Sequence, residues 1–222
     1  SKESEKRLNI LYLSRWYPNR YDPMPGLFIQ RHAEAANLYD NIGVVYVHSS
    51  TENEAQKFEI VEKTINNVNT VIVYYNSVKN KIPVVSQICK VVRFYRANFI
   101  GINRLKKSMG SFDLIHIHIL TRLGLLGLYY KWFKNTNFVV SEHWSRYLPA
   151  TADFKGGFRK YASRLVAKNA SCITTVTENL AKAMRSHNLK NDNYQVLANV
   201  LSPEFLNFEK PLESLKQKTN IT

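Results

Sequence analysis

Residues 114–141, LIHIHILTRLGLLGLYYKWFKNTNFVVS, decide the fold. They contain an apolar run of strand length at 114–119, an apolar run of helical length at 123–133, and a short strand-like run at 138–141. A strand, a helix and a second strand in this order predict a βαβ unit, in which two parallel strands are joined by a right-handed crossover.

The same alternation continues on both sides of this unit. Before it, two strand-like runs flank an Asn-rich turn, which predicts a strand pair. We therefore expect an α/β domain with a Rossmann-like, doubly wound, mostly parallel sheet covered by helices on both faces. The expected strands are 8–13, 44–47, 58–65, 70–75, 114–119, 138–141, 171–176 and 194–197, and the expected helices are 27–39, 83–109, 123–133, 157–168 and 178–187.

The predicted helix 83–109 is amphipathic. It begins at Pro83 and is followed by Gly110, which are common residues at a helix start and just past a helix end. One face is basic and the opposite face is apolar. We therefore expect the helix to contact an anionic membrane surface; the alternative is that its apolar face packs on the sheet. The expected apolar face consists of Ile88, Val91, Val92, Tyr95, Phe99, Ile102 and Leu105.

Charge and composition narrow the function classes. The 222 residues carry a net charge of +14, and residues 63–141 contain one acid against twelve Lys or Arg. Such a field favours anionic partners: phospholipid headgroups, nucleic acid or a phosphorylated substrate. No run of about 18 apolar residues occurs, so no membrane-spanning helix is expected. The N-terminus lacks the apolar core of a signal peptide, which favours a cytoplasmic location.

Polar and aromatic side chains gather just after the predicted strands. Ligands of open parallel sheets bind beyond the carboxyl ends of the strands, so these segments are where a site is expected. The segments are Arg15-Trp16-Tyr17, Leu120-Thr121-Arg122, Glu142 to Tyr147, Thr177-Glu178-Asn179 and Ala198-Asn199.

Glu142-His143-Trp144 is the most informative of these segments. We expect His143 to donate a hydrogen bond to a sugar hydroxyl and Glu142 to accept hydroxyl protons or act as a base, so both are candidate catalytic residues. Trp144 and Tyr147 are candidate substrate residues, because their rings can stack on a sugar. The alternative is a capping glutamate and a packed tryptophan.

Two further positions are candidates for ligand contacts. Gly26, at the start of the first helix, lets a diphosphate approach a positive helix end; the alternative is a plain helix-entry glycine. His118, at the end of its strand, is expected to touch substrate. His116 is expected to be a core histidine that donates to a backbone carbonyl, and with no third ligand nearby in sequence no metal site is predicted.

Arginines cluster in sequence around the first loop. Arg15 and Arg31, together with Arg20, are expected to hold a phosphate or carboxylate, because a guanidinium binds either group through two parallel hydrogen bonds. Trp16 lies beside Arg15 and is a further candidate substrate residue.

Several of these segments resemble bacterial glycosyltransferase family four. The likeness covers about residues 8–205, and its motifs occur in the order of the family. The motifs are Ile10 to Pro18, Pro25 to Ala35, Phe112 to His118, Ser141 to Ser145, Thr175 to Leu180 and Val196 to Val200.

The resemblance implies the N-terminal, acceptor-side half of a retaining GT-B enzyme, in which two Rossmann-like domains face a cleft. By motif match, Gly26 would approach the donor diphosphate, His143 would contact the donor sugar, and Asn199 would lie at the cleft floor. No metal or other cofactor is implied, since the nucleotide-sugar is a co-substrate. Residues 1–205 would form this domain, and 206–222 a linker toward a missing donor domain. Ser202-Pro203-Glu204 departs from the family, which usually has an Asp there.

The expected function is transfer of a sugar from a nucleotide-sugar to a cell-envelope acceptor, either a polysaccharide or a lipid-linked one. The isolated domain is expected to be inactive. The protein is expected on the inner face of the membrane or free in the cytoplasm, without a nucleic-acid partner. Two alternatives are a basic nucleic-acid-binding α/β module, which the charge allows, and half of a GT-B-shaped sugar-nucleotide epimerase.

Overall fold

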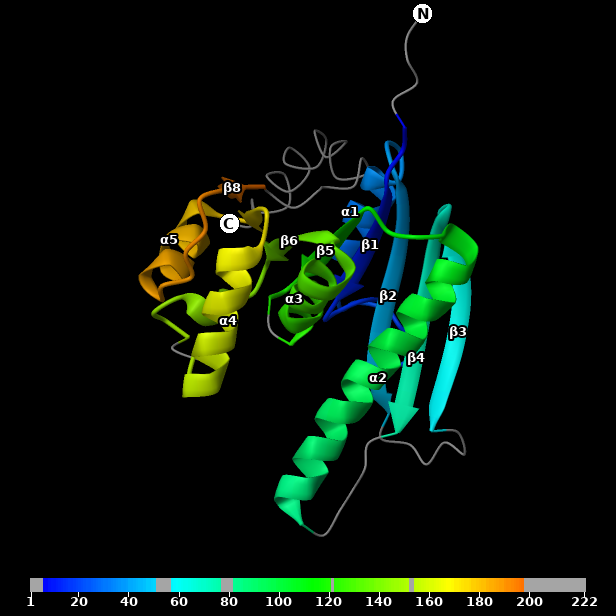
Figure 1. Cartoon of the computed structure of the whole chain (residues 1–222), viewed down its shortest axis with the longest axis horizontal. Coiled ribbons are helices and arrows are strands. Elements are labelled where there is room, and N and C mark those ends of the chain that lie inside the picture. Colours follow the sequence, from blue (N-terminus) through cyan, green and yellow to red (C-terminus); the bar gives the residue numbers. More distant parts are fainter. Residues whose placement is uncertain (1–5, 51–56, 77–81, 121, 152–153, 198–222) are drawn as a thin grey trace, which may run out of the picture.

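The computed structural model of the chain describes residues 6–50, 57–76, 82–120, 122–151 and 154–197. Within these residues, eight strands form one sheet in the order β3-β4-β2-β1-β5-β6-β7-β8 (Figure 1). The strands are β1 (Asn9–Ser14), β2 (Asn41–Ser50), β3 (Phe58–Ile65), β4 (Val68–Asn76), β5 (Leu114–His118), β6 (Asn137–Glu142), β7 (Ile173–Thr175) and β8 (Tyr194–Val196). The helices are α1 (Leu27–Ala36), α2 (Pro83–Met109), α3 (Leu123–Lys134), η1 (Ser145–Tyr147), α4 (Gly157–Asn169) and α5 (Glu178–Ser186).

The predicted sheet is confirmed. All neighbouring strands are parallel except β3 and β4, which form the predicted antiparallel pair across Asn66 and Asn67. The central unit is β5-α3-β6, with Ile115 opposite Phe138. The parallel strands end at one edge of the sheet, which we call the carboxyl edge; they begin at the opposite, amino edge.

Two apolar clusters hold the layers together. The larger one contains side chains from α2, α3 and α4 together with alternate residues of the strands, such as Leu11 and Ile117. The smaller one places Ile29 and Ala33 of α1 against Tyr12, which points from β1 to the opposite side. Because neighbouring residues of a strand face opposite sides of a sheet, the two clusters cover the two faces of β1.

Helix α2 has the predicted bounds, but the predicted apolar face is only partly correct. Its second half packs on the sheet, where a Cβ on Gly101 would come within 2.7 Å of Val45. Its first half extends past the ends of β2 and β4 (Figure 1). Ile88 and Val92, which belong to the apolar face, are each 58% exposed. None of the helices among the described residues has the length and apolar character needed to cross a bilayer.

Candidate active site at the carboxyl edge

The structure brings together predicted site residues that are far apart in sequence. Arg15 and Trp16 follow β1, His118 ends β5, and His143 and Trp144 follow β6. The rings of Trp16 and Trp144 are 5.3 Å apart between centroids, and the guanidinium carbon of Arg15 lies 5.2 Å from the Trp144 ring. The carboxyl edge therefore carries one contiguous group of aromatic and basic side chains.

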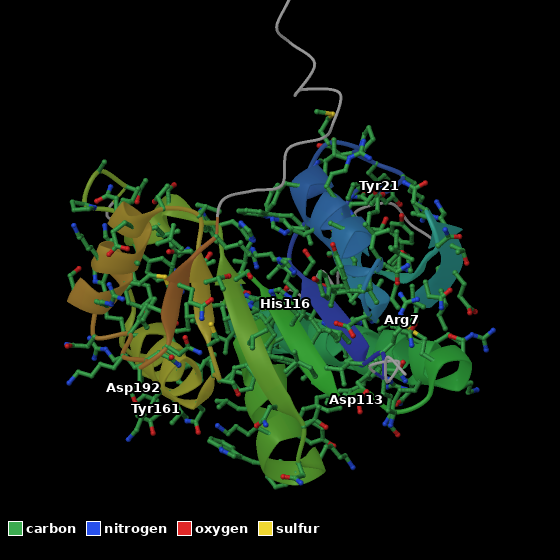
Figure 2. The ribbon with its side chains drawn as sticks, turned by 90° about the horizontal axis from the view of Figure 1, so that it is seen from above. Arg7, Tyr21, Asp113, His116, Tyr161 and Asp192 are labelled. Atoms are coloured by element: carbon green, nitrogen blue, oxygen red, sulfur yellow. The ribbon has the colours of Figure 1, made fainter. Side chains whose placement is uncertain are left out.

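Three histidines form a stacked row across β5 and the end of β6. His116 and His118 stack with centroids 4.2 Å apart, and Nδ1 of His118 lies 3.3 Å from Nε2 of His143. Figure 2 shows His116 near the centre of the molecule. Its Nε2 lies 2.6 Å from Oγ of Ser141, so its hydrogen-bond partner is a side-chain hydroxyl. The prediction that this partner is a backbone carbonyl was wrong.

The inner part of this row is uncharged. Burial, followed by repulsion from neighbouring histidines, lowers the pKa of His116 to about 3. The same causes hold the pKa of His118 well below its usual range. Both rings are thus neutral at physiological pH, and a neutral ring donates through one nitrogen and accepts through the other. His118 is 1% exposed, so the structure connects it to a ligand only through His143.

His143 lies at the open end of the row and is half-buried. Its ring packs on Phe28 of α1, with centroids 4.7 Å apart, and lies 6.1 Å from the ring of His32. Phe28 and His32 were not singled out in the sequence. Their spacing of four residues, just after Gly26, places them on one face of the helix and is a signal that could have found them.

Glu142 organises the loop that carries His143 and Trp144. Its side chain is completely buried, and Oε1 accepts hydrogen bonds from the backbone N–H of His143 at 3.0 Å and of Trp144 at 2.9 Å. Oε2 accepts from the N–H of Leu120 at 3.1 Å. Burial raises the pKa of this carboxyl group, opposed by these hydrogen bonds and by Arg146. This is the capping arrangement that the sequence left as an alternative.

Glu142 also holds a strained turn after β5. Ile119 has φ of 74°, which is unusual for a β-branched residue. Its N–H donates to the carbonyl of Ser141 at 2.8 Å, and the next residue, Leu120, donates to Glu142. Strained backbone persists where the surroundings over-determine it and is concentrated at functional sites. Ile119 was not predicted, because no sequence pattern marks a buried isoleucine as strained.

Gly26 is required by the backbone itself. Its φ is 74°, and a Cβ at this position would overlap the carbonyl of Trp16 and the N–H of Tyr17. The glycine therefore lets the start of α1 lie directly against the loop after β1. It fixes the position of Trp16 and of the helix face that carries Phe28.

The remaining predicted residues have separate environments. Tyr147 is 1% exposed, packs on Phe154, and its hydroxyl donates to Glu142 at 3.4 Å, so it supports the loop from within. Arg20 pairs with Glu59 at 2.7 Å, and Arg31 pairs with Glu34 at 3.2 Å. Neither joins Arg15 in a common site. Asn199 and the segment 206–222 lie outside the described residues.

The histidine row does not form a metal site. Among the described residues, no group of three or more His, Cys, Asp or Glu side chains is arranged to hold a metal ion. The row instead ends in one half-buried imidazole beside two tryptophans, which suits hydrogen bonding to a hydroxyl and stacking on a sugar ring.

Residues 70–205 match the family model described as Glycosyltransferase Family 4, and this span is more than half of the chain. The chain belongs to Glycosyltransferase Family 4. The predicted family is thus confirmed. No curated protein matches the sequence significantly.

Solved structures agree with the GT-B glycosyltransferase fold. Sucrose-phosphate synthase from Thermosynechococcus elongatus superposes with a TM-score of 0.61 at 12% identity, covering 97% of this chain and 53% of that chain. Anabaena HepE in complex with UDP superposes with a TM-score of 0.50 at 13% identity, covering 95% and 50%. This family 4 chain thus spans about half the length of these relatives.

Proposed function

We propose that this chain is the acceptor-side half of a glycosyltransferase that moves a sugar from a nucleotide-sugar to a cell-envelope acceptor, either a polysaccharide or a lipid-linked one. The observation that carries the proposal is the position of His143. It ends the histidine row at the carboxyl edge, beside Trp144, in a chain of Glycosyltransferase Family 4. HepE was solved with UDP, which supports a nucleotide-sugar donor.

The proposed chemistry needs only side chains and the two substrates. The bond between the anomeric carbon and the diphosphate oxygen of the donor breaks, and the anomeric carbon bonds to the acceptor oxygen. The proton of the acceptor hydroxyl passes to the released diphosphate oxygen. His143 donates a hydrogen bond to a hydroxyl of the transferred sugar near the reacting carbon, and Trp16 and Trp144 stack on sugar rings. Glu142 acts by positioning, because its carboxylate oxygens already hold three backbone N–H groups. No metal or other cofactor is part of this proposal.

The proposal assigns residues 1–205 to the acceptor-side domain, and 206–222 to a linker toward a donor-binding domain. It is tested by assaying sugar transfer with the 222-residue chain alone and with the same chain joined to a donor-binding domain. We expect the chain alone to fold, to bind nucleotide-sugar weakly in calorimetry, and to give no transfer. Robust turnover by the 222-residue chain would contradict the two-domain proposal.

We also propose that this domain attaches reversibly to the anionic inner surface of a membrane. The first half of α2 exposes Val84, Ile88 and Val92, and the same helix carries Lys90 and Arg93. On α4, Phe158 and Tyr161 are 77% and 66% exposed, and Tyr161 lies on the periphery in Figure 2. These apolar side chains, together with the exposed basic residues Arg159, Arg164 and Lys168 of α4, match an acidic lipid surface, where each basic residue contributes about 1 kcal/mol.

Co-sedimentation with vesicles tests the attachment. We expect binding to vesicles that contain phosphatidylglycerol, no binding to vesicles of phosphatidylcholine alone, and weaker binding as salt shortens the Debye length. The paired variant Ile88→Ser with Val92→Ser should lower binding, because both side chains are exposed and their loss leaves the core intact. Failure of the wild-type chain to bind anionic vesicles at low salt would refute the attachment.

A further inference from the structure

A cavity of about 410 Å³ opens at the carboxyl edge, between α2, the start of α3, η1 and α4. It is distinct from the histidine row, but Trp144 connects the two. Two residues of the cavity lining, Arg15 and Arg146, place their guanidinium carbons 5.2 Å and 3.3 Å from the centre of the Trp144 ring.

Four arginines from four separate segments converge on this cavity. Arg15 follows β1, Arg122 precedes α3, Arg146 lies in η1 and Arg159 lies in the first turn of α4. Among the described residues, no Asp or Glu lines the cavity. Within the described part of the chain, Arg15, Arg122 and Arg159 form no ion pair.

Half of the eight arginines outside the cavity have an acidic partner. Four of them have a glutamate partner within ion-pair distance, and all four lie outside the cavity. These pairs are Arg20 with Glu59, Arg31 with Glu34, Arg104 with Glu62 and Arg185 with Glu178. Local pairing with an acid is therefore common among the other arginines, whereas the described residues place four arginines and no acid around the cavity.

Arg15 is close enough to the other three arginines to be repelled by them. Burial, followed by repulsion from Arg146, Arg122 and Arg159, lowers the pKa of its guanidinium. Two helices also begin beside the cavity, α3 after Arg122 and α4 two residues before Arg159, and neither has an acid in its first turn. Helix starts carry partial positive charge. An anion in the cavity would relieve both effects at once.

The walls of the cavity show that the ligand is more than a bare ion. Val91 and Tyr95 of α2 and Phe158 of α4 supply apolar surface beside the arginines. Phe158 is 77% exposed, so this apolar wall continues to the outside of the molecule. A ligand that fits has an anionic group at the arginines and a carbon-rich part against the helices.

We propose that this cavity binds the phosphate or diphosphate group of the acceptor. Guanidinium groups bind phosphate oxygens through paired hydrogen bonds, and four of them suit a group with several anionic oxygens. Trp144 then links the bound phosphate to His143, so that the acceptor hydroxyl is presented beside the transfer site. This inference deepens the proposed glycosyl transfer and rests on it for the identity of the ligand as acceptor.

Binding of inorganic pyrophosphate to the 222-residue chain, measured by calorimetry at low salt, tests the site. We expect Arg122→Gln and Arg159→Gln each to weaken binding about tenfold, because each removes a charge-assisted hydrogen bond. Arg104→Gln is the matched control: it removes the same charge from an exposed residue outside the cavity and should change affinity by less than about twofold. Arg146 is left intact because it is buried.

The outcomes separate specific binding from general attraction. No binding of pyrophosphate by the folded wild-type chain, or an equal loss in Arg104→Gln and in the two cavity variants, would overturn the proposal. The measurement needs no sugar transfer. If the chain binds pyrophosphate through these arginines but takes no part in sugar transfer, the phosphate site is supported and the proposed function is refuted.

Two further arms identify the source of the phosphate. A soluble hexose 6-phosphate represents a free sugar phosphate, and phosphatidylcholine vesicles with added phosphatidic acid represent a lipid-borne phosphate. Binding that is weakened by Arg122→Gln and Arg159→Gln in either arm supports the site and names its source. Binding in neither arm through these arginines would overturn the assignment to an acceptor.

Discussion

The two edges of the sheet carry very different hollows. The amino edge has the larger one, about 670 Å³, and the carboxyl edge has the arginine cavity of about 410 Å³. At the amino edge the polar side chains tie loops together: Asn37 accepts from the N–H of Ile42 at 2.9 Å, and Asn9 donates to the carbonyl of Met109 at 2.9 Å. At the carboxyl edge, four arginines line the cavity, and none of the described Asp or Glu residues lines it with them. The size of a hollow therefore says less about function than the state of the polar groups around it.

Replacing His143 tests the carboxyl edge most directly. In the proposed two-domain enzyme, we expect His143→Ala to lower turnover by about 10- to 1000-fold, a loss of about 1.4 to 4 kcal/mol of transition-state stabilisation. The half-buried ring leaves the core intact, so the unfolding midpoint should change little. Steady-state kinetics and thermal denaturation together decide the matter. Wild-type turnover with a lowered midpoint would assign His143 to the core instead.

Gly26 tests whether the carboxyl edge depends on close backbone contact. We expect Gly26→Ala to lower the free energy of unfolding by about 2 to 4 kcal/mol, because it combines a positive φ with overlap against the backbone of Trp16. Asn135→Ala at the amino edge is the control, since Asn135 has φ of 51° and is exposed. It should cost about 1 kcal/mol. Equal losses in urea denaturation would show that the overlap has no effect.

Acid should weaken the fold through the histidine row. His116 and His118 have lower pKa values in the folded chain than the 6.5 of a free histidine, so the unfolded chain binds protons first as pH falls. Stability is therefore full above about pH 6.5 and is lost below it, by about 2 kcal/mol for each histidine at about pH 5. Urea denaturation at about pH 6.5 and at about pH 5 measures this loss of stability. An identical loss in His116→Gln would contradict it.

Asn37 gives the smallest expected effect and completes the comparison. We expect Asn37→Ala to lower the free energy of unfolding by about 1 kcal/mol, since it removes the hydrogen bond to the N–H of Ile42. Turnover of the two-domain enzyme should stay unchanged, because this residue lies at the amino edge. A loss of turnover without a loss of stability would move function to the larger hollow.

Elements with strong local signals were predictable from the sequence. Helix α2 has the predicted ends, because Pro83 and Gly110 mark them. Helix α1 ends at Ala36, three residues before the predicted end at residue 39, because Asn37 is its C-cap. Strand β2 reaches Ser50, beyond the predicted residue 47, because β4 pairs with its polar end. The exposure of Ile88 was not predictable, since periodicity gives the apolar face of a helix and not where the sheet beneath it ends.

The candidate site was only partly predictable for a related reason. His143 and Arg15 were predictable, because each directly follows the last residue of a strand. The arginine cavity was not found. Arg122, Arg146 and Arg159 come from three segments whose convergence depends on how α3, η1 and α4 pack, and no short-range pattern encodes that.

Strand β3 has a consequence for how the protein behaves at high concentration. It lies at the open side of the sheet, where unpaired backbone groups can recruit a strand of another molecule. Glu59, Glu62 and Lys63 place charge along this strand, and the two acids are held by Arg20 and Arg104, which come from the loop after β1 and from α2. Such charges oppose strand addition. β3 therefore protects the parallel sheet from aggregation by strand-to-strand pairing on that side.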